Sequence, residues 1–229
     1  MTTMVPVIAI DGPGGSGKGE ISRAVAHKLG WHLLDSGALY RTVALTAITK
    51  SVDLKDAQTL ADLARKLAVR FDNVGEGGQA FLGGRDVTKD IRSEEAGLGA
   101  SVIASIPAVR EALITAQRSF RQAPGLVADG RDMGSVVFPD AGLKIFLTAS
   151  VAERVLRRYK QLKEKGINVS LPALSRDMEE RDRRDLERST APLQATTEAR
   201  VLDTTRLGIP DVVQRVLRWA AETYPKQLV

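Results

Sequence analysis

Cysteine is absent from this sequence of 229 residues, which has two histidines and an aromatic content of only 4%. Without cysteine the chain can form no disulfide, thiolate metal site or cysteine nucleophile. His27 and His32 are too few for a histidine-rich metal centre, and we expect both to be surface or packing residues. Aromatic residues are also too scarce to form a stacking platform for single-stranded nucleic acid.

Long apolar runs are missing too, and no segment approaches the roughly 18–20 residues of a membrane span. The amino end lacks the basic region and cleavage site of a secretory signal, so we expect a cytoplasmic protein. The formal net charge is +5, which is compatible with nucleic acid, a membrane surface or a small polyphosphate. The basic residues after position 150 alternate with acidic ones instead of forming an arm. Most of them are therefore expected on solvated helix faces, and the others in an anion site.

The chain alternates between short apolar segments and amphipathic ones. Strands are predicted at 7–10, 31–34, 126–130, 144–148 and 200–203, with helices near 17–29, 36–50, 107–120, 151–164, 171–188 and 210–223. A stretch from about 53 to 105 interrupts this order with a helical segment, a hairpin around 83–84 and a helix at 91–105. Five strands alternating with helices predict a parallel sheet covered on both faces.

A glycine-rich loop follows the first strand and gives the strongest chemical signal. It runs Gly-Pro-Gly-Gly-Ser-Gly-Lys-Gly from Gly12 to Gly19, the glycine and lysine spacing of a phosphate-binding loop. Glycines let successive N–H groups point at anionic oxygens, and the following helix adds the positive end of its dipole. Lys18 can reach the β- and γ-phosphates of a nucleotide.

Two acidic residues bear on a magnesium ion at this loop. Gly19 and Glu20 follow Lys18 where many such loops place a hydroxyl residue, so the usual magnesium-binding hydroxyl is missing. Asp129 ends an apolar strand, which is the form of a second nucleotide-site strand, and is a candidate for a water-mediated magnesium contact.

Arginines are concentrated in the last third of the chain. Arg154, Arg157 and Arg158 lie on one predicted helix, and Arg181, Asp185 and Arg188 share one face of the next. Solvated, salt-bridged helices are one interpretation. Beside a phosphate-binding loop, arginines that neutralise a transferring phosphoryl group are the favoured one.

Four segments resemble the bacterial-type cytidylate kinases. They are Leu33–Arg41 (Leu-Leu-Asp-Ser-Gly-Ala-Leu-Tyr-Arg), Val109–Leu113, Ala128–Gly134 (Ala-Asp-Gly-Arg-Asp-Met-Gly) and Glu180–Asp182. The resemblance covers nearly the whole chain in order. The first and third segments are specific to that family, whereas the loop alone would not be. The departure is Glu20, where the family more often has a hydroxyl residue.

The resemblance implies an α/β fold of the P-loop nucleoside monophosphate kinase type, with a five-stranded parallel sheet flanked by helices. It implies core segments at 1–35, 108–149 and 166–229, a monophosphate-binding insertion at 36–107 and a short lid at 150–165. The implied reaction is ATP-dependent phosphorylation of CMP and dCMP by a monomer with Mg²⁺ held mainly by ATP phosphates and water. No nucleic acid or membrane partner is implied.

The resemblance also implies residue roles. The catalytic residues would be Lys18, Arg131, Arg158 and Arg188. ATP would be bound by Gly12, Pro13, Gly14, Gly15, Ser16, Gly17, Lys18, Gly19, Glu20, Arg154 and Arg157. The acceptor phosphate would be held by Ser36, Arg41, Arg131 and Arg188, the cytosine by Ser101, Arg110 and Asp132, and the sugar by Arg181 and Asp185. Tyr40 is also assigned to the CMP set. Packing beside Arg41 is an alternative role for Tyr40, and capping of the following helix is an alternative role for Ser36.

Three other functions compete with this one. A kinase for another small metabolite would share the loop but not the acceptor set, especially Asp132 and Arg110. A GTPase-type switch usually carries Asn-Lys-x-Asp, whereas Asn73 and Asn168 are each followed by valine. A basic nucleic-acid-binding module is disfavoured by the low aromatic content and the dispersed charge.

Overall fold

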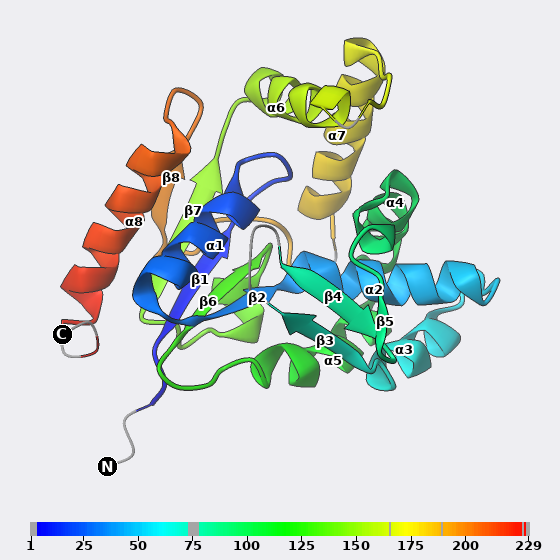
Figure 1. Ribbon diagram of the computed structural model, residues 1–229, viewed down its shortest axis with the longest axis horizontal. Coiled ribbons are helices and arrows are strands. Elements are labelled where there is room, and N and C mark those ends of the chain that lie inside the picture. The colour runs from blue at the N-terminus through cyan, green and yellow to red at the C-terminus, as the bar shows by residue number, and fades with distance from the viewer. Residues whose placement is uncertain (1–3, 73–77, 165, 189, 226, 228–229) are drawn as a thin grey trace. The chain divides into compact units, whose positions relative to one another are not determined.

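The computed structural model describes residues 4–72, 78–164, 166–188, 190–225 and 227. The chain forms two compact units. The first, here called the core unit, consists of Met1–Leu34 and Phe120–Val229, and the second, the smaller unit, of Asp35–Ser119. One sheet has five strands in the order β2-β6-β1-β7-β8, and the other has three in the order β3-β4-β5 (Figure 1).

The five-stranded sheet is built from the apolar segments that the sequence marks as strands. They are β1 (Val7–Asp11), β2 (His32–Asp35), β6 (Leu126–Gly130), β7 (Leu143–Thr148) and β8 (Arg200–Asp203). β1 pairs in parallel with both β6 and β7, and β7 pairs in parallel with β8. Every residue of β1 and β6 is buried, as expected for central strands covered on both faces. The predicted α/β fold with a five-stranded parallel sheet is confirmed.

Helices α1 (Lys18–Leu29) and α8 (Ile209–Thr223) cover one part of this sheet. Their apolar faces share a buried cluster with the strands, which includes Ile8, Ile21, Val25 and Val216. α1 ends at Gly30, whose φ of 65° is left-handed and suits glycine. This packing holds the first turn of α1 at the carboxyl end of β1, where the glycine-rich loop lies.

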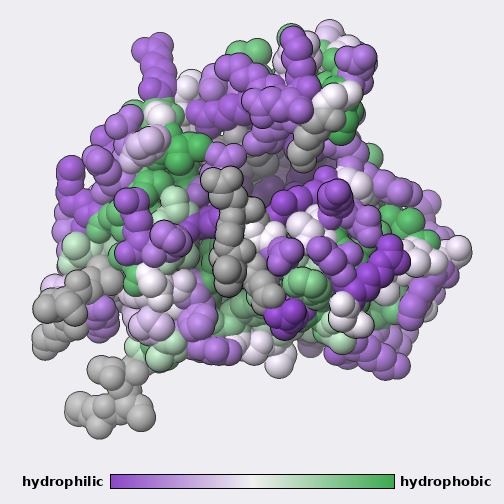
Figure 2. Space-filling view, viewed as in Figure 1, coloured by the Kyte–Doolittle hydropathy of each residue, from purple (hydrophilic) through white to green (hydrophobic). Residues whose placement is uncertain are grey.

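Helices α6 (Val151–Glu164) and α7 (Leu171–Leu186) pack on each other through Val155, Leu162 and Leu174. Hydrophilic residues dominate the surface over these two helices (Figure 2). α7 is shorter than the predicted 171–188, so Arg188 lies beyond the helix. The chain turns there, and the Leu193 amide donates to the Asp185 carbonyl oxygen at 2.8 Å.

The described residues of the smaller unit form four α-helices and a three-stranded sheet. Its elements are α2 (Ser36–Thr49), α3 (Ala57–Arg65), β3 (Val69–Asp72), β4 (Gln79–Leu82), β5 (Arg85–Asp86), the 3₁₀-helix η1 (Asp90–Arg92), α4 (Glu94–Ile103) and α5 (Pro107–Arg118). Residues of α2, α3, α4 and α5 share one apolar cluster. Because α5 packs in that cluster, this unit extends to Ser119, past the boundary at 107 drawn from the sequence.

The predicted helix at 91–105 is two elements. η1 ends at Ser93, and the Ser93 side chain caps α4 by accepting from the Ala96 amide at 3.2 Å. Among the described residues no single helix is long and apolar enough to cross a membrane, although α4 and α5, bent by 105°, pass that test of length and composition as a pair.

Candidate active site

The glycine-rich loop connects β1 to α1 and has the backbone geometry of an anion cradle. Gly12 has φ 147°, and a Cβ there would lie 2.0 Å from the Leu147 carbonyl oxygen, so only glycine fits. Gly17, with φ 89°, precedes α1, and no side chain caps that helix end. Its amides therefore point along the positive end of the helix dipole toward the loop.

Lys18 lies in the first turn of α1 and is nearly buried. Its Nζ donates to the Pro13 carbonyl oxygen at 2.8 Å, and the Ser16 hydroxyl donates to the same oxygen at 3.0 Å. Burial lowers the pKa of Lys18 to about 7, helped by Arg131 and opposed by Asp129. A bound polyphosphate would supply the missing negative charge and favour the ammonium form.

Asp129 borders the loop from the neighbouring strand β6. A Cβ built on Gly19 would lie 3.5 Å from the Asp129 Oδ2 atom. The carboxylate thus faces the position where a hydroxyl residue follows the lysine in other loops. No group of three or more His, Cys, Asp or Glu side chains suited to a metal occurs among the described residues. Asp129 is a single carboxylate beside the loop, and a contact to a metal-bound water needs no more than that.

Glu20 lies in the same turn and is exposed. Its position in the first turn of α1 is favourable for a carboxylate because of the helix dipole. Unlike Lys18, it is not drawn into the buried part of the loop.

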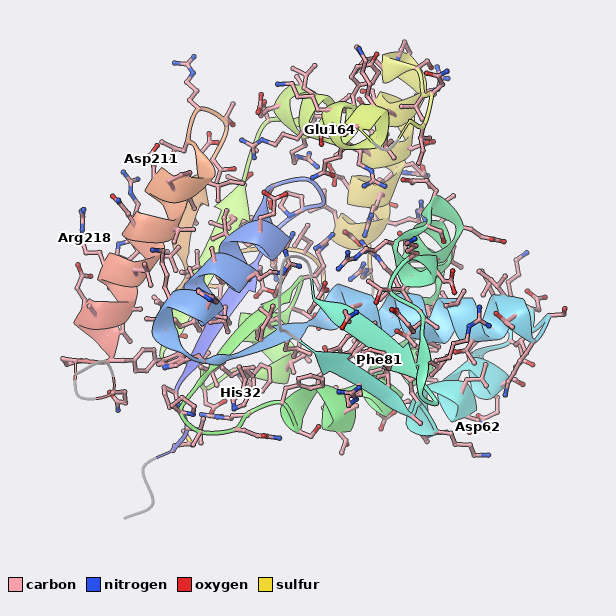
Figure 3. The ribbon with its side chains drawn as sticks, in the orientation of Figure 1. His32, Asp62, Phe81, Glu164, Asp211 and Arg218 are labelled. Carbon is pink, nitrogen blue, oxygen red and sulfur yellow. The ribbon has the colours of Figure 1, made fainter. Side chains whose placement is uncertain are left out.

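An arginine–aspartate cluster lies beside the loop in the core unit. Arg131 Nε donates to Asp185 Oδ2 at 2.9 Å, and the Arg188 guanidinium donates to the other oxygen of the same carboxylate. Burial alone would raise the pKa of Asp185, but Arg131 and Arg188 hold it below its ordinary value. A Cβ on Gly14 would lie 3.6 Å from Arg131 and 3.9 Å from Arg181. Two positive groups thus adjoin the phosphate loop, and nitrogen-bearing side chains gather along α7 (Figure 3).

Arg154 connects three parts of the core unit. Its guanidinium donates to the carbonyl oxygens of Ala149 and Gly14, both at 3.0 Å, and to both carboxylate oxygens of Asp182, at 3.1 and 2.6 Å. Arg154 is only 3% exposed. In this structure its hydrogen-bonding groups hold the loop against α6 and α7.

Arg157 makes a second connection to the loop through Thr204. It donates to the Thr204 hydroxyl at 3.1 Å and to the Thr204 carbonyl oxygen at 2.6 Å, and the Thr204 hydroxyl donates to the Ser16 carbonyl oxygen at 3.1 Å. Glu153 pairs with the same guanidinium at 2.9 Å. Arg158 follows on α6 and is half-buried.

The remaining predicted acceptor residues belong to the smaller unit. Ser36 and Arg41 lie on α2, Ser101 on α4 and Arg110 on α5. The Ser101 hydroxyl is buried and has no hydrogen-bond partner among the described residues. Arg110 is buried and donates to the Ala104 carbonyl oxygen at 3.3 Å.

The structure bears on two alternatives left open by the sequence in this unit. Asp35, not Ser36, caps α2, since its side chain accepts from the Ala38 amide at 2.9 Å. Ser36 is the first residue of the helix and is buried. Tyr40 packs in the apolar cluster of the unit, as its packing interpretation predicts.

Three residues at the site have no role in the sequence prediction. Asp11 ends β1 and accepts hydrogen bonds from the Met133 and Gly134 amides, Asp182 binds Arg154, and Thr204 binds Arg157. Only Asp11 carries a signal in the sequence, because a carboxylate that ends an apolar strand beside a phosphate loop is placed like Asp129. His32, labelled in Figure 3, is exposed and lies 2.9 Å from the Ala123 carbonyl oxygen, in agreement with its surface assignment.

A phosphate loop at the carboxyl end of a central parallel strand, a buried lysine and an arginine cluster beside it define a P-loop phosphotransferase of the nucleoside monophosphate kinase type. Comparison with known proteins makes the assignment specific. A model of the cytidylate kinase family ("Cytidylate kinase") matches residues 8–222. The chain belongs to the cytidylate kinase family.

Curated relatives agree over nearly their whole length. A cytidylate kinase of Pseudomonas entomophila is 54% identical over 218 residues, which is 94% of this chain and 96% of that protein. A cytidylate kinase of Klebsiella pneumoniae is 51% identical over 222 residues, covering 97% of this chain and 98% of the relative. The family resemblance stated from the four motifs is confirmed.

Proposed function

We propose that this protein transfers the γ-phosphoryl group of ATP to the phosphate of CMP or dCMP, yielding ADP and the cytidine diphosphate. The observation that carries the proposal is the placement of Lys18, Arg131 and Arg181 against one glycine loop. Phosphoryl transfer to a second phosphate requires a loop that binds the phosphates of ATP. It also requires positive side chains beside that loop.

The chemical step needs little from the protein beyond position and charge. The attacking atom is an anionic phosphate oxygen, so no strong general base is required. Lys18 would follow the transferring oxygens, while Arg131, Arg158 and Arg188 would neutralise the charge that builds on the phosphoryl group. The paired state of Arg131 and Arg188 on Asp185 holds both guanidinium groups in place before substrate binds.

Magnesium fits the site as a companion of ATP. When bound, Mg²⁺ would neutralise charge on the β- and γ-phosphate oxygens. Asp129 would hold one of its waters, and the loop amides would orient the phosphates. The side chains at the loop need no further metal ligand for this arrangement.

Recognition of the acceptor follows the family resemblance. Cytosine would be bound by Ser101, Arg110 and Asp132, since cytosine has an amino donor at position 4 and an acceptor at N3 where uracil has the acceptor O4 and the donor N3–H. Ser36, Tyr40 and Arg41 would contact the acceptor phosphate and its surroundings, and Arg181 and Asp185 the sugar. The unpartnered Ser101 hydroxyl supports this assignment.

The segment 150–165 would act as a lid. Arg154 and Arg157 would support ATP binding by holding the loop in place, and Arg158 would contact the transferring phosphoryl group. Exclusion of water from the closed site would prevent hydrolysis of ATP. The family resemblance further supports a cytoplasmic monomer that binds ATP and CMP or dCMP but neither nucleic acid nor membrane.

An acceptor panel tests the proposal. ADP release is followed in a coupled assay with ATP and CMP, dCMP, UMP, AMP or GMP, and with ATP alone. We expect fast release with CMP and dCMP, slower release with UMP and little without an acceptor. ADP release that is independent of the acceptor would overturn the kinase assignment, and preference for another monophosphate would overturn the cytidine assignment.

A further inference from the structure

The π-helix η2 (Met133–Val137) begins directly after Asp132 and has an unusual cap. Aspartate at the residue before a helix ordinarily accepts hydrogen bonds from the first-turn amides through its own side chain. Asp132 makes no such capping bond. Its carbonyl oxygen instead accepts from the Val136 and Val137 amides at 2.9 and 3.2 Å.

The first-turn amides of η2 are bound by a residue 122 positions earlier in the chain. Asp11 Oδ1 accepts from the Met133 amide and Asp11 Oδ2 from the Gly134 amide, each at 2.8 Å. Both oxygens of one carboxylate are thus used on two adjacent donors. Asp11 of strand β1 thus makes the capping bonds that Asp132 could otherwise make.

The turn that begins η2 is tightly packed. A Cβ on Gly130 would lie 2.7 Å from the Met133 side chain, and one on Gly134 would lie 3.2 Å from the Lys144 stem. Met133 is fully buried, and Asp11 is only 8% exposed. Without the Asp11 carboxylate the two buried amides would need another acceptor, because leaving them unpaired is costly. The carboxylate nearest to them in the sequence belongs to Asp132.

We propose that Asp11 is a positioning residue for acceptor choice, which caps η2 from strand β1 and so keeps the Asp132 carboxylate from turning into the capping role instead of accepting from the cytosine amino group. This inference rests on the proposed function, in which Asp132 reads the base. Asp11 itself touches no substrate in this account. It acts through Asp132 and through the backbone of the turn that Arg131 and Asp132 share.

The test compares kcat/KM for CMP and UMP in five proteins: wild type, Asp11→Asn, Asp11→Ala, Asp132→Ala and the double variant Asp11→Ala/Asp132→Ala. The wild type should prefer CMP, and Asp132→Ala should lose most of that preference. Asp11→Ala should reduce the CMP-to-UMP ratio at least about tenfold, and Asp11→Asn, which keeps one acceptor, should fall between. The double variant should match Asp132→Ala, because the two residues act on one contact.

A matched control separates this effect from loss of stability. Asp56 caps α3, its side chain accepting from the Thr59 amide at 3.0 Å, and it lies outside the acceptor set. Asp56→Ala should lower the melting temperature without changing the CMP-to-UMP ratio. An unchanged ratio in Asp11→Ala, or additive losses in the double variant, would overturn the inference.

A measurement on the wild type alone serves if the Asp11 variants fold poorly. Burial raises the pKa of Asp11 to about 7, opposed by the two amides and by Lys18 and reinforced by Asp132; Arg131 is a further charge near it. A protonated Asp11 can accept at only one oxygen, so the ratio should fall as the pH drops from about 8.5 to 6. The phosphate ionisation is common to CMP and UMP and cancels. A constant ratio would contradict the inference, whereas a wild type that fails to prefer CMP would instead refute the proposed function.

Discussion

At the residue scale, two helices of the site are capped by a residue other than the one that the sequence suggests. Asp35 caps α2 in place of Ser36, and Asp11 caps η2 in place of Asp132. In both cases another carboxylate makes the capping bond, so the residue assigned to acceptor binding does not make it. The family motifs point to Ser36 and Asp132, and Asp35 lies in the same motif as Ser36, but the sequence does not show that Asp35 and Asp11 make the capping bonds. Asp11 is distant in the chain, and nothing in its own segment indicates its partners.

Lys18 gives the first prediction at this scale. Lys18→Met should lower kcat by about 10²–10³, the loss found when a group that stabilises transition-state charge is removed. The fold should survive, since the lysine head faces the loop. Steady-state kinetics with ATP and CMP measure the loss, and a variant that retains more than half of wild-type turnover would remove Lys18 from catalysis.

The same substitution should increase the stability of the unliganded protein. Burial lowers the pKa of Lys18 to about 7, so between that pH and the ordinary lysine range the unfolded chain binds a proton that the folded chain lacks. The contribution of Lys18 to the free energy of unfolding therefore becomes more favourable as pH rises through this window and is most unfavourable below it. Lys18→Met should melt higher than wild type at pH 7, and the difference should shrink toward pH 10. A lower melting temperature at pH 7 would contradict this.

Glu20 gives a prediction about metal dependence. Its carboxylate in the first turn of α1 repels ATP weakly through solvent, because the side chain is exposed. Glu20→Thr should tighten ATP binding roughly threefold at low free Mg²⁺ and change it little when Mg²⁺ saturates the phosphates. ATP titrations at several fixed Mg²⁺ concentrations measure this. The same Mg²⁺ dependence in both proteins would show that Glu20 has no influence on the nucleotide.

At the element scale, the loop, α6 and α7 are joined by the Arg154–Asp182 pair. The two side chains are 4% and 18% exposed, so the pair is shielded from solvent. This distinguishes it from the Arg183–Glu180 pair on the same helix, whose side chains are 60% and 46% exposed. Both pairs join an arginine to an acidic residue, so it is burial that makes the Arg154–Asp182 pair the larger contributor to stability.

Arg154→Lys should therefore weaken both the fold and ATP binding. A lysine cannot replace the fork that binds Asp182 while also reaching Gly14. The loss of stability should approach, but not exceed, the roughly 3–5 kcal/mol that breaking a buried pair costs. We expect a lower urea midpoint and a larger increase in KM for ATP than for CMP. Arg183→Lys is the matched control and should leave both quantities unchanged. Equal effects of the two substitutions, or none in Arg154→Lys, would rule out the proposed connection.

Most elements could be predicted from the sequence because apolar runs and glycine or proline signals agree along the chain. β1, α1, β6 and β7 follow directly from such patterns. The π-helix η2 could not be predicted, since five residues carry no periodicity and its cap comes from a distant strand. The predicted end of α7 is two residues too late. The helix stops earlier because the chain turns, and the Leu193 amide donates to the Asp185 carbonyl oxygen.

At the scale of the whole molecule, the two units divide the predicted site residues between them. The ATP residues and the Arg131–Asp185–Arg188 cluster belong to the core unit, while Ser36, Arg41, Ser101 and Arg110 belong to the smaller unit. The sequence could assign the latter set only through family motifs, because each residue taken alone has an ordinary structural explanation. The core set could be reached from chemistry, since a glycine loop, a lysine and clustered arginines point to phosphate without any family knowledge.

Transfer of label from ATP radiolabelled at the γ-phosphate tests the central claim most directly. The protein is incubated with labelled ATP and Mg²⁺, with and without CMP, and the products are separated by thin-layer chromatography. We predict that the label appears in CDP when CMP is present and that almost none appears as inorganic phosphate in either case. Labelled inorganic phosphate formed at the same rate with and without CMP, with no labelled CDP, would contradict the account.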